Sequence, residues 1–276
     1  TSVASLAVSE AEGHLNYKDQ HLTVERGDFH LLGNPVRIHG CIPLGFGNQH
    51  LLPDTCQLSI QSDGFQLTSL DGLFPQISQL GGHLDIEVKI AGDLFHPELT
   101  ASIHMVQGTM QLLDFPQPLE DLEIALGVSG GQKSSHGLVT VDLKSANWQL
   151  GGGRYQAKGN WRLSKTATES SLSSVVTALT HNNPVEFWLQ LGGEGVNLID
   201  LANYVVQREI PQVEGRANIL LNLQGKGYNV AGVSATLVCE DLHIDINNRV
   251  VRNLDGMRFQ IADRKLSVEP FRIGEG

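Results

Sequence analysis

The chain has 276 residues, including 30 glycines and only 6% aromatic residues, and its formal net charge is -11. Without a basic stripe to neutralise phosphates, this acidic balance argues against a nucleic-acid partner, and no basic run is present to hold anionic lipid headgroups. No apolar stretch reaches the roughly 18 residues of a membrane-spanning helix. Many glycines and few aromatics are typical of short strands joined by tight turns rather than of an α/β enzyme core.

The first part of the chain, residues 1–46, contains short strand-like runs that end at glycines, among them Leu22–Val24 before Gly27 and Arg37–Gly40. The same arrangement closes two later blocks of the chain. We therefore predict that residues 1–46 are the tail of a preceding repeat unit, and that the chain is a segment of a longer protein.

A run of alternating side chains at Gly82–Gly92 is repeated at Gly215–Gly225, 133 residues later. The flanking glycines repeat as well, because Gly64 precedes the first run by 18 residues and Gly195 precedes the second by 20. Repeated supersecondary blocks of this kind stack into an elongated body. The predicted divisions are repeat unit A at residues 47–163, a Ser- and Thr-rich loop or short helix at 164–184, and a truncated repeat unit B at 185–276.

Alternation with a period of two recurs through most of the chain and predicts half-buried strands with one apolar face and one wet face. Apart from the possible short helix within 164–184, short helices are predicted at residues 70–74 and 198–206, which occupy equivalent positions in the two units. Turns between strands are expected at Gly92-Asp93, Gly108 and Asn247-Asn248.

A sheet with one apolar face must cover that face with helices, with a second sheet or with itself. The chain has too few amphipathic helices for this task, and too few aromatics for a large sandwich core. We therefore predict an all-β fold in which an elongated antiparallel sheet curls around a groove, with minor short helices. If the sides of the groove touch, its lining is an ordinary core, and if they stand apart it is a hydrophobic lumen. The alternation leaves both arrangements open.

The candidate lining of this groove consists of the apolar residues that share one face of the predicted strands. They are Leu84, Ile86, Val88, Ile90, Ile103, Ile124, Val141, Leu189, Ala217, Ile219, Leu221, Leu223, Leu237, Ile244 and Phe259.

A cycle of short motifs runs through both units. In unit A it reads Gly82-His83-Leu84 to Gly92, Pro97-Glu98-Leu99-Thr100-Ala101, Leu119-Glu120-Asp121-Leu122, and Leu150-Gly151-Gly152-Gly153-Arg154-Tyr155 to Gly159. In unit B it reads Val213-Glu214-Gly215 to Gly225, Val230-Ala231-Gly232, Arg252-Asn253-Leu254, and Val268 to Gly274. This cycle resembles the repeat region of the TamB family within the AsmA-like group. The chain departs from the family pattern in lacking the proline before Val230 and in carrying the inserted stretch Ser164–Asn183.

The resemblance implies a taco-shaped β-sheet whose hydrophobic lumen conducts phospholipid between the inner and outer envelope membranes and supports outer-membrane protein assembly. The implied partners are phospholipid acyl chains in the groove and, through regions outside this segment, a BamA-like outer-membrane barrel protein. The implied location is the periplasm, with an inner-membrane anchor in the full-length protein, or the intermembrane space for a plastid relative. The alternative is a closed β-solenoid-like scaffold or interaction module without lipid cargo.

No motif supports catalysis, a cofactor or a metal, so we expect a protein that is not an enzyme. Ser129 stands in a G-x-S-x-G string, but a polar turn and another strand follow it where a hydrolase elbow needs a helix. Gly151-Gly152-Gly153 precedes alternating residues and predicts a β-turn, not a phosphate cradle. The 11 histidines show no metal-ligand spacing. Cys41 and Cys56 could form a disulfide in an oxidising space, although small apolar residues facing a core are the favoured interpretation.

Overall fold

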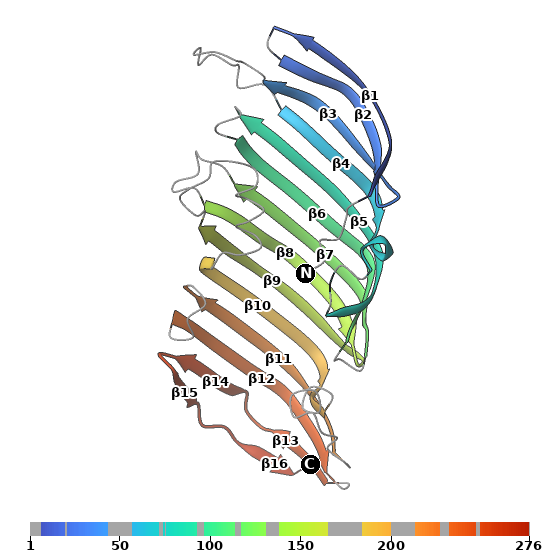
Figure 1. The fold of residues 1–276 in the computed structure, drawn as a ribbon. Coiled ribbons are helices and arrows are strands. Elements are labelled where there is room, and N and C mark those ends of the chain that lie inside the picture. Colours follow the sequence, from blue (N-terminus) through green and yellow to red (C-terminus); the bar gives the residue numbers. More distant parts are fainter. Residues whose placement is uncertain are drawn as a thin grey trace.

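The structure is a computed structural model that describes residues 7–19, 21–43, 57–71, 74, 76–92, 97–113, 117–130, 138–164, 184–199, 213–226, 232–246 and 249–275. Within these residues the fold is all-β, as the alternation predicts. Sixteen strands form one long, open antiparallel sheet, and each strand from β1 to β13 lies beside its neighbours in the sequence. The strands stack along an elongated, curved body (Figure 1).

The strands of the first half are β1 (Val8–Lys18), β2 (His21–Leu31), β3 (Asn34–Pro43), β4 (Gln57–Gln66), β5 (Ile77–Gly92), β6 (Pro97–Leu112), β7 (Leu119–Gly130) and β8 (Leu138–Leu150). Those of the second half are β9 (Gly153–Ser164), β10 (Pro184–Asn197), β11 (Val213–Gly225), β12 (Val233–Ile246), β13 (Arg249–Asn253), β14 (Met257–Ala262), β15 (Lys265–Val268) and β16 (Ile273–Glu275).

The sheet divides at its C-terminal edge. One half of β12 pairs with β13 and the other half with β14, and these two strands carry β16 and β15 respectively (Figure 1). The segment between β13 and β14 is fixed by Asn253, whose side-chain oxygen accepts a 2.8 Å hydrogen bond from the Leu242 amide. Arg272 donates two hydrogen bonds to Asp255, of 2.7 and 2.9 Å, and these hold the pKa of the Asp255 carboxyl below its usual value.

A line of β-bulges crosses the sheet and bends its long strands. The pairing register shifts at about the same level in successive strand pairs, and a bulge increases the local twist and bend of a strand. The shifts lie between Val24 and Gly27, Ser62 and Phe65, Met105 and Gly108, Leu143 and Ala146, Gly193 and Val196, and Arg216 and Asn218. In Figure 1 the strands of the middle of the sheet run obliquely from the left to the right and bend downward near their right-hand ends.

The repeated glycines make the same contact in both halves of the chain. Gly64 has a φ of 68° and its amide donates a 2.8 Å hydrogen bond to Asp85 Oδ1. Gly195 has a φ of 60° and its amide donates a 2.9 Å hydrogen bond to Asn218 Oδ1. A positive φ is accessible to glycine without steric cost. The 133-residue repeat therefore carries one bulge geometry twice, whereas the unit boundaries drawn from the sequence stay a prediction.

Gly108 corrects one expectation. It was predicted to lie in a turn, but it lies inside β6, which continues to Leu112. A Cβ atom at Gly108 would come within 2.7 Å of the Leu122 carbonyl oxygen on β7. The glycine therefore permits close approach of two strands at the bulge, and its presence does not mark the end of a strand.

Within the described residues helix is scarce, as predicted. The 3-10 helix η1 occupies Leu67–Leu70 and buries Leu67, so it begins before the first predicted helix at 70–74, of which residues 72 and 73 lie outside the described residues. The second predicted helix begins in the helical residues Leu198 and Ile199 and then passes outside the described residues, as does most of the predicted loop at 164–184.

Three buried clusters lie towards the margins of the sheet's apolar face. Two of them lie beside the line of bulges, one built on Leu67, Leu80, Met105 and Leu122 and the other on Ala217, Cys239, Leu242 and Met257. The third lies at the opposite end of the strands, where Val139 at the start of β8 packs with Leu163 at the end of β9. Burial of these side chains supplies the main apolar stabilisation of the body.

We predict that the side chain that accepts the bond from each bulge glycine stabilises the fold through that bond. Asp85→Ala should lower the free energy of unfolding by about 1 kcal/mol, because the Gly64 amide loses its acceptor. Asp85→Asn keeps an acceptor, as Asn218 does in the second copy, and should change the free energy by less than about 0.5 kcal/mol. Urea unfolding followed by circular dichroism measures both, and equal losses in the two variants would contradict this role.

Candidate functional site: the apolar face of the sheet

Cross-strand pairing places apolar side chains in continuous rows on one face of the sheet. Directly opposed residues of antiparallel strands point to the same face, so the register alone defines each row. The central row contains Ser62, Ile86, Ile103, Leu126, Leu143, Gly159, Leu189, Leu223, Ala235, Ile261 and Leu266. The row nearer the bulges contains Phe65, Leu84, Met105, Ile124, Ala146, Ala157, Leu191, Leu221, Leu237, Phe259 and Val268.

A third row runs on the other side of the central one. It contains Ile60, Val88, Ala101, Val128, Val141, Trp161, Phe187, Gly225 and Val233. None of the three rows contains a charged residue, although the chain as a whole carries 49 Lys, Arg, Asp and Glu residues. The face is therefore an apolar strip that crosses the sheet from β4 to β15.

The structure brings all 15 residues of the predicted lining to this face. Eleven of them lie in the three rows, and the other four are Ile90, Ala217, Ile219 and Ile244. Ile90 pairs with Leu99, Ile219 with Cys239 and Ile244 with Val251, which extends the same face on either side. Ala217 is only 1% exposed, so it belongs to a buried cluster and forms no part of an accessible wall.

Several residues of the strip are absent from the predicted lining, although some of them continue the alternating runs of the sequence. Leu126 and Leu191 end the alternating runs that start at Leu122 and Phe187, and Leu143 ends the run from Val139. Phe65 and Trp161 were missed because glycines interrupt the alternation around them. The register shift at the bulge, which sequence alone does not show, restores Phe65 to the apolar face.

The middle of the strip is only half-buried. Apart from the alanines, glycine and clustered residues named above, the side chains from Ile86 on β5 to Leu237 on β12 are partly exposed to solvent. In the part of the chain that the structure describes, each strand makes its main contacts with its neighbours in the sheet, and the other extensive contact is between β5 and η1. Among the described residues, η1 packs on the bulge-side margin of the strip through the cluster of Leu67 and Met105, and no other described element outside the sheet makes an extensive contact with it.

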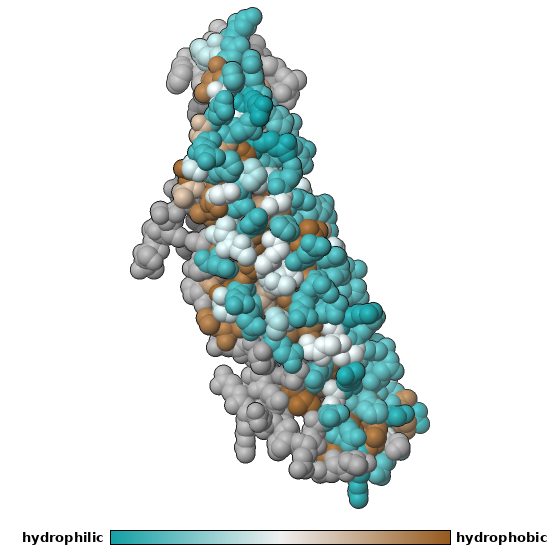
Figure 2. All heavy atoms as spheres, turned by 90° about the vertical axis from the view of Figure 1, so that its right-hand side faces the viewer, coloured by the Kyte–Doolittle hydropathy of each residue, from teal (hydrophilic) through white to brown (hydrophobic). Residues whose placement is uncertain are grey.

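The opposite face of the strands is largely polar and carries ion pairs. On β5, Glu87 accepts a 2.8 Å contact from Lys89 and a 3.2 Å hydrogen bond from Gln61. The hydrogen bond from Lys89 and then that from Gln61 lower the pKa of the Glu87 carboxyl, so the group stays ionised at neutral pH. The side of the body at the right of Figure 1 is mostly hydrophilic, with hydrophobic residues among the polar ones (Figure 2).

The cysteines separate into two kinds. Cys239 is free and lies in the buried cluster beside Ala217, where burial raises the pKa of its thiol and keeps it neutral at pH 7. Cys41, by contrast, is disulfide-bonded, which corrects the interpretation favoured from the sequence for this residue. Cys56 lies outside the described residues.

The structure places the motifs that were considered for catalysis, phosphate binding and metal binding. Ser129 lies within β7 opposite Thr140, not on a strand-to-helix elbow. Gly151 and Gly152 form the tight β8–β9 turn with positive φ values of 58° and 76°, as predicted. No group of three or more His, Cys, Asp or Glu residues with metal-binding geometry occurs in the described ranges. None of the described helical segments is long and apolar enough to cross a bilayer.

Comparison with known proteins gives no family assignment: no family model matches the chain, and no curated protein and no solved structure is significantly similar to it. The inference of function therefore rests on the geometry of the sheet and on the motif cycle.

We predict that truncating a leucine of the strip destabilises the fold far less than truncating one in a marginal cluster. Leu67 is 2% exposed, so Leu67→Ala should lower the free energy of unfolding by about 3 kcal/mol. Leu221 is partly exposed in the middle of the strip, so water already reaches it. Leu221→Ala should therefore lower the free energy of unfolding by only about 1 kcal/mol. Urea unfolding of the two variants measures the difference. Equal costs would mean that Leu221 is packed in a closed core.

Proposed function

We propose that this chain is a non-enzymatic segment of an intermembrane bridge of the AsmA-like type, whose apolar strip carries phospholipid between two envelope membranes. The observation that supports the proposal is the charge-free, partly exposed strip that crosses the sheet from β4 to β12 and continues on β14 and β15. Monomeric soluble proteins rarely leave a contiguous apolar surface of this extent in water, so the strip calls for an apolar occupant.

The dimensions of the strip suit acyl chains. Strands in a sheet lie about 4.8 Å apart, so the strip from β4 to β15 extends roughly 50 Å along the body. Its three rows are two residues apart along each strand, which makes the strip roughly 13 Å wide between the outer rows. An acyl chain can therefore move along the body while remaining on apolar side chains throughout.

The strip binds by apolar contact and makes no recognisable site for a headgroup. The rows offer no charged side chain, and the hydrophobic effect that would hold an acyl chain is non-directional. We accordingly propose that transfer depends on the acyl chains and that the headgroup stays in water beside the open face. Support for outer-membrane protein assembly follows from the same proposal, because that membrane needs a supply of lipid.

The proposed setting is the periplasm, or the intermembrane space for a plastid relative, with a membrane anchor and a BamA-like barrel partner bound by regions outside this segment. The disulfide at Cys41 supports an oxidising compartment, where such bonds persist. The polar face, with ion pairs such as Lys89 to Glu87, is suited to contact with water along the whole bridge.

We predict that lipid contacts one face of β5 only. A photo-crosslinking amino acid at Ile86 should capture phospholipid when the protein is made in cells, because Ile86 lies in the central row. The same probe at Glu87, one residue along, should capture none, because that side chain lies on the polar face beside Lys89. Lipid mass spectrometry of the labelled protein reads out both positions. Equal labelling, or labelling at Glu87 alone, contradicts the assignment of the faces.

We also predict that a single charge in the strip stops transfer without unfolding the protein. Leu221→Asp places a carboxylate among the apolar rows. An acyl chain that passes over it would have to displace its bound water, which is energetically costly. Transfer of a fluorescent phospholipid between vesicles by the purified segment should fall at least tenfold, while the far-UV circular dichroism spectrum is unchanged.

Asn222→Asp is the matched control for that variant. Asn222 is adjacent in sequence, points to the polar face and accepts a 2.8 Å hydrogen bond from Gln190 that a carboxylate can also accept. Its transfer rate should equal that of the parent chain. Undiminished transfer by Leu221→Asp would remove the strip from the lipid path and favour the closed scaffold as the function.

A further inference from the structure

Trp188 on β10 is an aromatic side chain on the polar face of the sheet. It is 43% exposed, whereas Trp161 and Trp148 lie on the apolar face, where Trp161 pairs with Phe187 and Trp148 stacks on Tyr155. An indole presents both a broad apolar face and an N–H donor, so it can contact a ligand that has an apolar face and polar groups.

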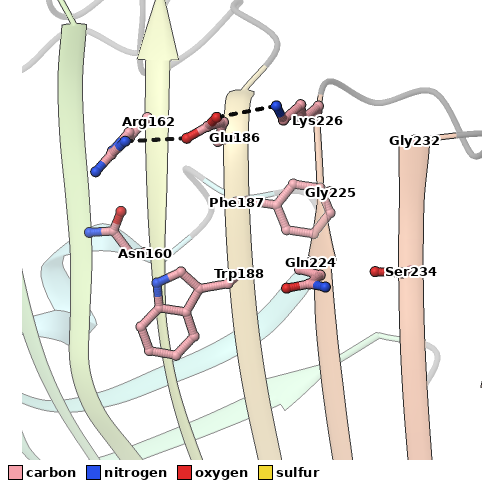
Figure 3. Close-up of a pocket in the computed structure, with 10 residues that line it drawn as sticks. All are labelled: Asn160, Arg162, Glu186, Phe187, Trp188, Gln224, Gly225, Lys226, Gly232 and Ser234. Atoms are coloured by element: carbon pink, nitrogen blue, oxygen red, sulfur yellow. Dashed lines mark hydrogen bonds and ion pairs between the residues drawn. The ribbon is translucent and has the colours of Figure 1, made fainter.

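Planar polar side chains surround this indole on neighbouring strands. Asn160 on β9 and Gln224 on β11 lie directly opposite Trp188 on either side. Figure 3 shows these groups in one row with Ser234 of β12, and the ring of Trp188 extends from β10 towards β9. The indole is thus flanked by amide groups that both donate and accept hydrogen bonds.

A second row of charged groups borders the first. Glu186 accepts contacts from Arg162 at 3.2 Å and from Lys226 at 3.7 Å, which holds its carboxylate between two cations (Figure 3). On the other side of Trp188, Gln190 donates a 2.8 Å hydrogen bond to Asn222. These contacts keep the polar side chains around the indole oriented before any ligand arrives, which lowers the entropic cost of binding.

The surface is hollowed on both sides of this row. One depression of ≈ 480 Å³ includes Trp188 and the charged row, and a second of ≈ 310 Å³ adjoins it towards Asn222 and Thr236. The two share Trp188, Gln224 and Ser234. Together they form a shallow trough with one aromatic platform and convergent polar groups, which is the composition expected of a small-molecule site.

We propose that this trough binds a pyranose oligosaccharide, with Trp188 as the platform for one sugar ring. A pyranose ring has C–H groups on its face and hydroxyl groups around its rim. The indole of Trp188 suits the apolar face, while Asn160, Gln224 and the Glu186 carboxylate suit the rim hydroxyls as donors and acceptors. An acyl chain would leave these polar groups without partners, so the trough takes a different ligand from the apolar strip on the opposite face.

Isothermal titration calorimetry with chitotetraose and cellotetraose tests the proposal. Both are neutral β-1,4-linked pyranose oligomers, and they differ in the N-acetyl group, so the comparison also separates recognition of the acetamido group from that of the bare ring. At least one should bind the parent chain with a dissociation constant in the millimolar range or tighter. Trp188→Ala should weaken that binding at least tenfold, and Trp188→Phe, which keeps a smaller platform, should lose less.

Trp161→Phe is the matched control, because it changes a tryptophan on the apolar face one strand away. It should bind the oligosaccharide as the parent does, with the same circular dichroism spectrum. Absence of binding to both oligomers, or equal binding by parent and Trp188→Ala, overturns the proposal. Neither result bears on lipid transfer, because the trough and the apolar strip occupy opposite faces.

Discussion

In a sheet of one layer, neighbouring strands satisfy each other's backbone hydrogen bonds, but this pairing covers neither face of the sheet. In this chain that constraint governs almost everything else. Antiparallel pairing joins β1 to β13 in sequence order, and alternation sends one set of side chains to water and the other to an apolar face. The described strands pack chiefly on their sheet neighbours, and the described element outside the sheet that packs extensively on the apolar face is η1, at its margin.

The line of bulges lets such a sheet remain stable. At each bulge the strand bends, and the side chains beyond the bend come close enough to bury one another, as Met105 does with Leu122 and Ala217 with Met257. The body is thereby held by clusters at the margins of its apolar face. The side chains around Ile86 and Leu221 remain partly exposed. Other residues of the rows take part in the clusters: Met105 is buried in one of them, and Leu84 packs against it.

The sequence predicts the parts of this fold that depend on local alternation. The runs at Gly82–Gly92 and Gly215–Gly225 place their aliphatic residues on one face, and the register extends that face across the sheet. The sequence does not predict features that depend on contact between strands. Gly108, for example, permits a close approach to Leu122 and does not form a turn. Trp188 likewise stands out only when β9 and β11 place Asn160 and Gln224 beside it.

One register determines both faces at once, and this ties the two proposed sites together physically. Because side chains alternate with a period of two, a shift of β10 by one residue against β11 would turn Leu189 towards water and Trp188 into the apolar strip. The hydrogen bond from the Gly195 amide to Asn218 lies at the bulge of this same strand pair and opposes such a slip. The polar contacts at the bulges therefore do more than stabilise a bend: they keep a charge-free surface on one side of each strand and a hydrogen-bonding surface on the other, which a bridge through water needs if it is to carry an apolar cargo.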